Sequence, residues 1–338
     1  MDQFFFLCIG CALLTYSLAH LYRLIANALQ IVDTPNHRSA HQGLVPTGAG
    51  VSFVLVFWAA FFLVSDQEVL TDSSIVVYRL IPALVVVATI GFIDDYHALS
   101  WKFRFTVHVL CCCYIVWVTG LPGLNFLGVH VDLGFVGMAI AVLGLIWLLN
   151  LYNFMDGIDG IASLQAIFVC LAGALLGSLW GADWALVQMC LVLGAACLGF
   201  LVFNWPQASL FLGDAGSVPL GFLLAAMSLA FASSGGIEWL TCWLILLGVF
   251  IVDASTTLCW RILKGQPFLQ AHNLHGYQRL SRHWKSHTRV LVLLMAINLF
   301  WLLPLAYLAM LSPEYSVIWL ICAYFPLVAG VLKTYKLP

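Results

Sequence analysis

Long apolar stretches constrain the fold of this chain more than any other feature of its sequence. Of its 338 residues, 63% are hydrophobic and only 8% are charged, and the mean hydropathy is +1.02. Soluble domains carry roughly 25% charged residues, so a chain with this composition does not fit a water-soluble domain. The stretches are also continuous, whereas the strands of a transmembrane barrel alternate apolar and polar residues. We therefore predict an all-α integral membrane protein, a polytopic helix bundle that forms a single domain over residues 1–338.

A membrane-spanning helix needs ~20 mostly apolar residues, and on that basis we predict about eleven spans. The first is interpreted as a transmembrane helix rather than a cleaved signal peptide, because Met1-Asp2-Gln3 lacks a basic segment. The predicted spans cover residues 4–24, 45–64, 75–92, 104–120, 135–150, 161–179, 184–203, 217–233, 239–262, 289–311 and 315–332.

Basic residues divide the connections between these spans into two groups. The odd connections, counted from the first span, and the C-terminal tail hold or adjoin 12 Lys and Arg residues, whereas the even connections hold only Arg79. The positive-inside rule then places the odd connections in the cytoplasm, the N-terminus outside and the C-terminus inside. A carboxylate beside a membrane costs free energy, and it is usually placed there to interact with a cation, a proton or a phosphate. Those at helix ends or in short connections on the cytoplasmic face are Asp33, Asp94, Asp95, Asp156, Asp159 and Asp214.

The stretch from Asn150 to Gly160 concentrates two amides and two carboxylates between two apolar spans. Asp156 and Asp159 are three residues apart, so they share one face of a helical turn if the next helix begins at or before Asp156. That turn carries the positive end of the helix dipole, and two glycines let a ligand approach the backbone. A helix cap explains one of these Asp residues. It does not readily explain two Asp residues together with Asn150 and Asn153.

Asp94 and Asp95 are adjacent carboxylates at the end of a predicted span. Acids at a helix C-terminus oppose the helix dipole, so stability alone would not select them there. Such a pair can hold Mg²⁺, or leave one carboxylate free to act as a base. Lys102 and Arg104 follow in the same connection and offer positive charge for phosphates.

Gly213-Asp214-Ala-Gly-Ser217 stands just before a predicted helix, with Asn204 upstream of it. Its free amides and the Ser217 hydroxyl suit phosphate oxygens, and Asp214 suits a metal ion. An ordinary N-cap with glycine spacing is the alternative for this segment. Arg38, in the first cytoplasmic connection, offers a planar fork for phosphate oxygens, with an ordinary surface turn as the alternative.

The longest cytoplasmic connection, about residues 263–288, contains His272 and His275. Two His residues three positions apart lack the third clustered ligand that a zinc site needs, so we interpret them as phosphate or sugar contacts. Asp253 is the one acid inside a predicted span, and pairing with a base such as Arg261 is one explanation for it.

Together these acids and bases on one face suit a Mg²⁺-bound diphosphate, with a second phosphate carried by a lipid. A transporter or lipid flippase is the alternative from a different class, and it predicts charges near the bilayer midplane. Only Asp253 fits that pattern, and no pair of broken helices in matching halves is evident.

This set, in this order, resembles the polyprenyl-phosphate N-acetylhexosamine-1-phosphate transferase family, which belongs to glycosyltransferase family 4. The family includes the enzymes that initiate O-antigen and the MurNAc-pentapeptide transferase of peptidoglycan. Ala49 stands where the family tends to have a further glycine, and the His272–His275 segment lacks the triple-His run of the peptidoglycan enzyme. The chain therefore looks more like the O-antigen-initiating members that take UDP-GlcNAc or a UDP-N-acetyl-6-deoxyhexose, with the peptidoglycan transferase as the alternative.

The resemblance implies a multi-pass enzyme of the bacterial inner membrane that initiates O-antigen or lipopolysaccharide synthesis on undecaprenyl phosphate and releases UMP. It implies Mg²⁺, with Mn²⁺ as a substitute, and no nucleic acid partner, and it leaves a homodimer open. By likeness, the catalytic carboxylates are Asp94, Asp95, Asp156 and Asp159. The metal ligands are Asp214 and Asp94. The substrate contacts are Arg38, Lys102, Asn150, Asn153, Asn204, His272 and His275.

Overall fold

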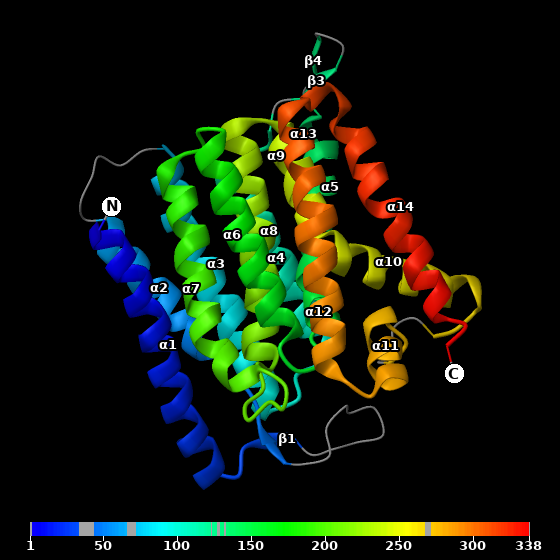
Figure 1. Cartoon of the computed structure of the whole chain (residues 1–338). Helices are drawn as coiled ribbons and strands as arrows, with labels where there is room; N and C mark the ends of the chain where they lie inside the picture. The colour runs from blue at the N-terminus through cyan, green and yellow to red at the C-terminus, as the bar shows by residue number, and fades with distance from the viewer. Residues whose placement is uncertain are drawn as a thin grey trace.

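The chain folds into a bundle of long helices with two short β-ribbons (Figure 1). The computed structural model describes residues 2–33, 44–65, 72–122, 124–126, 129–131, 133–267 and 272–337. The helices are α1 (Asp2–Ala28), α2 (Val51–Ser65), α3 (Asp72–Tyr96), α4 (Trp101–Thr119), α5 (Gly134–Met155), α6 (Ile161–Leu179), α7 (Trp184–Asn204), α8 (Asp214–Gly235), α9 (Ile237–Leu246), α10 (Gly248–Leu263), α11 (Gly276–Trp284), α12 (His287–Ile297), α13 (Leu303–Leu311) and α14 (Ser316–Thr334). A π-helical segment, Asn298–Leu302, joins α12 to α13.

The helices confirm a polytopic, all-helical membrane protein. Eight helical segments of the described chain are long and apolar enough to cross a bilayer, and α9 with α10 makes a ninth if the bent pair is one span. The two other predicted spans correspond to α2 and α3. The apolar part of α2 in the described chain is only Val51–Ala60, and α3 carries Asp94 and Asp95 in its last turn.

Two antiparallel ribbons lie at opposite ends of the bundle. β1 (Val32–Asp33) pairs with β2 (Val45–Pro46), and β3 (Leu124–Phe126) pairs with β4 (Val129–Val131). The ribbon of β1, together with α11 and the start of α12, lies at the lower end of the bundle in Figure 1, while β3 and β4 lie at the top. We call the lower end the site end, because the acids described below gather there.

Helix α8 forms the centre of the bundle. Its most apolar stretch is completely buried, whereas only 11% of the corresponding stretch of Pro313–Thr334, which contains α14, is buried. Close approach to its neighbours requires small residues: a Cβ on Gly221 would lie 2.6 Å from the Cβ of Tyr152 on α5. Since α8 packs against both α3 and α5, its N-terminus is placed between the ends of those two helices.

The predicted single helix over residues 239–262 is wrong, because the chain bends by 75° between α9 and α10. An interrupted helix exposes backbone polar groups that have no water to bond in an apolar interior. Buried side chains from two other helices meet this need. Gln165 Nε2 donates to the carbonyl of Leu246 at 3.1 Å, and Asn298 Nδ2 donates to Gln165 Oε1 at 2.6 Å.

Candidate functional site

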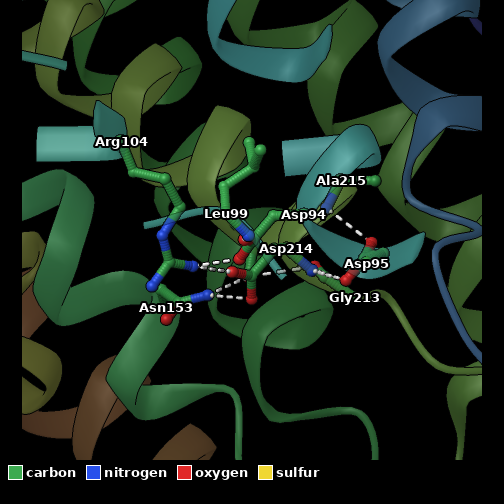
Figure 2. Close-up of polar contacts among 9 residues, drawn as sticks. Asp94, Asp95, Leu99, Arg104, Asn153, Gly213, Asp214 and Ala215 are labelled. Atoms are coloured by element: carbon green, nitrogen blue, oxygen red, sulfur yellow. Dashed lines mark hydrogen bonds and ion pairs between the residues drawn. The ribbon is translucent and has the colours of Figure 1, made fainter. Parts of the chain in front are cut away.

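Three helix ends bring two carboxylates and one cation together at the site end (Figure 2). Asp94 lies in the last turn of α3, Asp214 is the first residue of α8, and Arg104 lies in the first turns of α4. Arg104 Nη1 lies 2.9 Å from Asp214 Oδ2 and also forms an ion pair with Asp94 Oδ2. The remaining oxygen of Asp94 accepts from the amide of Leu99 at 2.8 Å, which fixes its orientation. One guanidinium therefore serves two carboxylates that are 120 positions apart in sequence.

Asp95 holds the N-terminus of α8. Its two carboxylate oxygens accept from the amides of Asp214 at 2.8 Å and Ala215 at 2.9 Å, which are groups that a helix start leaves unpaired. Gly213 has φ +71, and a Cβ there would lie 2.4 Å from Asp95 Oδ2, so this position needs glycine. Burial raises the pKa of Asp95 to about 7, and the negative charges of nearby Asp214 and Asp94 act in the same direction.

Asn153 connects the motif of residues 150–160 to this cluster. Its side-chain amide donates to Asp214 Oδ1 at 2.8 Å and to Ser217 Oγ at 2.9 Å, as Figure 2 shows for the first of these contacts. Helix α5 extends to Met155, five residues beyond the predicted end at 150, and so places Asn153 on its last turn. Asn150 is different, because its Nδ2 donates to the carbonyl of Ile146 one turn earlier.

Asp156 and Asp159 do not share the first turn of a helix. Helix α6 begins at Ile161, so both lie in the link between α5 and α6, with Asp156 as the C-cap of α5. The glycines around them stop the helix: Gly160, with φ +76, is the residue from which α6 starts. Burial raises the pKa of Asp156 to about 7, helped by the charges of Asp214, Asp95 and Asp159, so Asp156 lies near the cluster.

Asp159 contacts the start of α12 rather than the acidic cluster. Its Oδ2 lies 3.1 Å from Nδ1 of His287 and accepts from the amide of Ala208 at 3.2 Å. Asn204 supports the same link from α7. It accepts from the amide of Gly160 at 3.1 Å and donates to the carbonyl of Leu210 at 3.0 Å. The structure thus gives Asn204 a positioning contact, and its contact with substrate stays a prediction.

Lys102 is a predicted cation that does not meet the acids in the described chain. Lys102 is exposed on the first turn of α4, with its Nζ 5.9 Å from the ring centroid of Trp101. Ser100 caps this helix, and Arg104, one turn after Ser100, is the residue that forms an ion pair with Asp94. Arg38 lies outside the described residues.

The His272–His275 segment is anchored by Asp253 on α10. Asp253 accepts from the amides of Gly276 at 2.8 Å and Tyr277 at 2.9 Å, and His275 Nδ1 lies 3.4 Å from its Oδ1. The proposed pairing of Asp253 with a base such as Arg261 is therefore replaced by a helix N-terminus and a histidine. The His272 and His275 rings lie 4.8 Å apart, and burial, with the positive charge nearby, lowers the pKa of His272 to about 4.

Helix α11 packs directly on the motif of residues 150–160. The hydroxyl of Tyr277 donates to the carbonyl of Phe154 at 3.1 Å, and a Cβ on Gly157 would lie only 2.2 Å from that hydroxyl. Neither Tyr277 nor His287 was predicted from the sequence to be a site residue. Both residues lie in a basic segment, and that pattern does not indicate which of its members contact the motif. The only sequence signal was the requirement for glycine in the motif.

The donor set at the site end suits a hard divalent cation. Within the described residues, no three His, Cys, Asp or Glu side chains already meet in a metal-binding arrangement. Yet Asp94 and Asp214 converge on a single positive group, and the pKa of both Asp95 and Asp156 is raised by burial and by neighbouring negative charge. Mg²⁺ prefers anionic oxygen ligands, and two carboxylates that share one guanidinium keep a net negative charge, so Asp94 and Asp214 are the residues that would hold it.

Comparison with known proteins finds one matching family model and several similar proteins. The model of the family described as glycosyl transferase family 4 matches residues 76–232, which include the acidic cluster. A probable undecaprenyl-phosphate N-acetylglucosaminyl 1-phosphate transferase of Bacillus subtilis (strain 168) is 28% identical over 279 residues, covering 81% of this chain and 76% of that protein. The decaprenyl-phosphate N-acetylglucosaminephosphotransferase of Mycobacterium leprae (strain TN) is 28% identical over 316 residues, covering 84% and 78%. A phospho-N-acetylmuramoyl-pentapeptide-transferase of Streptococcus equi subsp. zooepidemicus is 27% identical over 283 residues, covering 75% and 82%.

Proposed function

We propose that the chain is a member of glycosyl transferase family 4 and that it transfers an N-acetylated sugar 1-phosphate from a UDP-sugar to a polyprenyl phosphate. The observation that carries this proposal is the convergence of Asp94, Asp214 and Arg104 at one end of the bundle. We take undecaprenyl phosphate as the acceptor, and UDP-GlcNAc or a UDP-N-acetyl-6-deoxyhexose as the donor. The product would then initiate O-antigen or another surface polysaccharide.

In the proposed reaction, an oxygen of the lipid phosphate attacks the β-phosphorus of the nucleotide sugar. A new P–O bond forms to the lipid phosphate, the bond between the β-phosphorus and the bridging oxygen breaks, and UMP leaves with that oxygen. Bound Mg²⁺ would neutralise the diphosphate charge and hold the leaving group in line. Asp94 and Asp214 form ion pairs with Arg104, which offsets part of their negative charge. Asp95 accepts hydrogen bonds from the first amides of α8 and so fixes the position of Asp214.

We assign the residues of the motif to these reactants from the contacts that each residue makes. Asp156 lies near the cluster and carries a raised pKa, so it suits contact with the nucleotide phosphates or their metal. Asn153 orients Asp214, and the His272–His275 segment suits the diphosphate or the sugar. The roles of Asp159, Lys102, Asn150 and Arg38 stay predictions.

We further propose that residues 1–338 form one transferase domain with eleven spans, α2 and α3 included. The site end would face the cytoplasm of a bacterial inner membrane, where UDP-sugars are available, and the lipid chain would lie in an apolar groove between helices. A homodimer is compatible with this arrangement.

The deciding experiment uses the purified full-length protein with undecaprenyl phosphate, Mg²⁺ and a panel of UDP-N-acetyl sugars. Release of UMP with formation of a lipid-linked sugar diphosphate is the expected result. The panel includes UDP-MurNAc-pentapeptide, because the streptococcal relative is named for that chemistry, and its exclusive use would replace the surface-polysaccharide assignment. Failure of every donor would overturn the transferase proposal.

Removal of divalent cations is expected to abolish UMP release reversibly. The acids at the site end cannot neutralise a diphosphate, so a cation must supply positive charge there. Excess EDTA should stop turnover, added Mg²⁺ should restore it, and Mn²⁺ should restore it in part. Circular dichroism under EDTA controls for unfolding. Full activity in excess chelator would contradict the metal assignment.

Arg104→Gln is expected to lower turnover by about a hundredfold, because it removes the positive charge that lies between Asp94 and Asp214. The carboxylates would then repel each other and lose their fixed spacing. Arg79→Gln is the matched control, since Arg79 contacts the carbonyl of Val118 and no carboxylate of the site. Equal activity of the two variants in the UMP assay would refute the role of Arg104.

A further inference from the structure

An aromatic and cationic stack joins the C-terminal end of the chain to two other elements. Trp260 lies in the last turns of α10, and Tyr335 directly follows α14. Their ring centroids are 4.2 Å apart with an interplanar angle of 29°. The guanidinium carbon of Arg279, on α11, lies 3.3 Å from the centroid of Tyr335 and 5.8 Å from that of Trp260. Residues from α10, α11 and the chain end therefore form one stack.

The stack compensates for part of the burial of the Arg279 cation. Arg279 is only 9% exposed, and within the described residues its Nη1 has no hydrogen-bond partner. A buried cation is costly unless a partner compensates for lost hydration. The face of an aromatic ring attracts a cation by about 0.5–2 kcal/mol, more when both are desolvated. Tyr335 presents such a face at short range, so the chain end stabilises the buried position of Arg279.

The position of Arg279 matters because the N-terminal half of α11, to which it belongs, also contacts the candidate site. Asp253 holds the first amides of α11, next to His275, and the hydroxyl of Tyr277 contacts the backbone of the motif at Phe154. The stack holds the same helix through Arg279, three residues after its first residue, Gly276. The stack and the contacts of Asp253 and Tyr277 therefore hold the N-terminal half of this nine-residue helix from different elements.

We propose that Tyr335 is a positioning residue, through which the C-terminal end of the chain clamps α11 and so holds the His272–His275 segment against the motif of residues 150–160. The clamp concerns donor binding, and in that respect it rests on the proposed function. Helix α14 has independent attachments: Tyr324 Oη donates to the carbonyl of Leu244 at 2.9 Å, and the indole of Trp301 donates to the carbonyl of Ala323. Removal of the Tyr335 ring therefore tests the clamp without releasing the helix.

The test compares Tyr335→Ala, Tyr335→Phe and the control Tyr315→Ala in the full-length protein. Tyr315 is exposed and lies just before the first residue of α14, at the other end of the same helix. Tyr335→Ala should raise the KM for the UDP-sugar about fivefold and leave kcat and the KM for the lipid phosphate within about twofold. Tyr335→Phe, which keeps the ring face, should behave as wild type, as should Tyr315→Ala. Adding Arg279→Gln to Tyr335→Ala should raise the KM little further, because both changes break the same contact.

Amide hydrogen exchange provides a readout that is independent of turnover. In Tyr335→Ala, the amides of α11 should exchange faster than in wild type, while those of α8 should not change. Unchanged exchange in α11 together with an unchanged donor KM would overturn the clamp. A loss of kcat that Tyr335→Phe does not rescue would also overturn it, since that pattern indicates general damage. If even the wild-type protein releases no UMP, the proposed function fails, and exchange in α11 alone then decides the clamp.

Discussion

Asp214→Asn is expected to lower turnover by about a thousandfold while the protein stays folded. Asp214 starts α8 at the centre of the bundle, and its two oxygens receive Arg104 at 2.9 Å and Asn153 at 2.8 Å. Asparagine keeps the size of the side chain and one oxygen that accepts a hydrogen bond, so the local packing survives. The negative charge is lost, and with it the attraction for a cation on the diphosphate. UMP release at saturating substrate and thermal unfolding of the detergent-solubilised protein are the measurements.

Asp183→Asn provides the matched control for this change. Asp183 caps α7 by accepting from the amide of Ala185 at 2.8 Å, so it is also an acid at a helix start. Asn and Asp cap helices about equally well, so this variant should retain activity and stability. The prediction concerns the difference between the two variants. Turnover of Asp214→Asn within a few fold of Asp183→Asn would remove Asp214 from the chemistry and from the proposed metal site.

The gathering of acids at one end could be predicted because it depends on the alternation of the chain across the membrane. Asp94 and Asp95 close α3, and Asp214 opens α8, so connections on the same side must bring them to the same end. Hydropathy places helix ends within a few residues, and charge bias assigns each connection to a side. These two rules apply to any sequence of spans, and they do not require knowledge of how the helices pack.

Contacts between particular side chains could not be predicted, because they depend on helix rotation and depth. Lys102 and Arg104 are equally plausible by sequence, yet only Arg104 faces Asp94 once Ser100 sets the start of α4. Asp253 looked like the partner of a nearby cation, and it instead accepts from the start of α11, more than twenty residues away. Such a contact depends on the bend between α9 and α10, which buried polar side chains from other helices support.

The motif of residues 150–160 shows a local structure that the sequence left open. Its two Asp residues would share a helical turn only if the next helix began at or before Asp156, but α5 runs to Met155 and α6 starts at Ile161, as the predicted span over residues 161–179 implies. A glycine can let a ligand approach the backbone closely, and it can also let the chain between two helices adopt a positive φ. The spacing of glycines in the sequence does not distinguish these two roles. In the structure, the requirement for Gly157 comes from the hydroxyl of Tyr277, a neighbour that no sequence pattern indicated.

Gly91→Ala is expected to reduce both stability and turnover, because this glycine sets the distance between α3 and the start of α8. A Cβ on Gly91 would lie 2.4 Å from the carbonyl oxygen of Asp214 and 2.8 Å from its carbonyl carbon. Backbone atoms cannot rotate away as a flexible side chain can, so α8 must shift relative to α3. Overpacking of this kind costs about 1–3 kcal/mol of unfolding free energy. A displacement of about 1 Å at a reacting group lowers turnover by about a hundredfold.

Gly144→Ala separates this steric effect from the general effect of replacing a helical glycine. Gly144 lies within α5, and a Cβ there would have no neighbour within 4 Å. Alanine in an open helical position stabilises by about 0.5–1 kcal/mol, so this variant should unfold at a slightly higher temperature and keep its turnover. The two substitutions are chemically identical, and they should shift stability in opposite directions. If Gly91→Ala were as stable and active as Gly144→Ala, then α3 and α8 could separate without consequence, and the fixed spacing of Asp94, Asp95 and Asp214 would not be what the reaction requires.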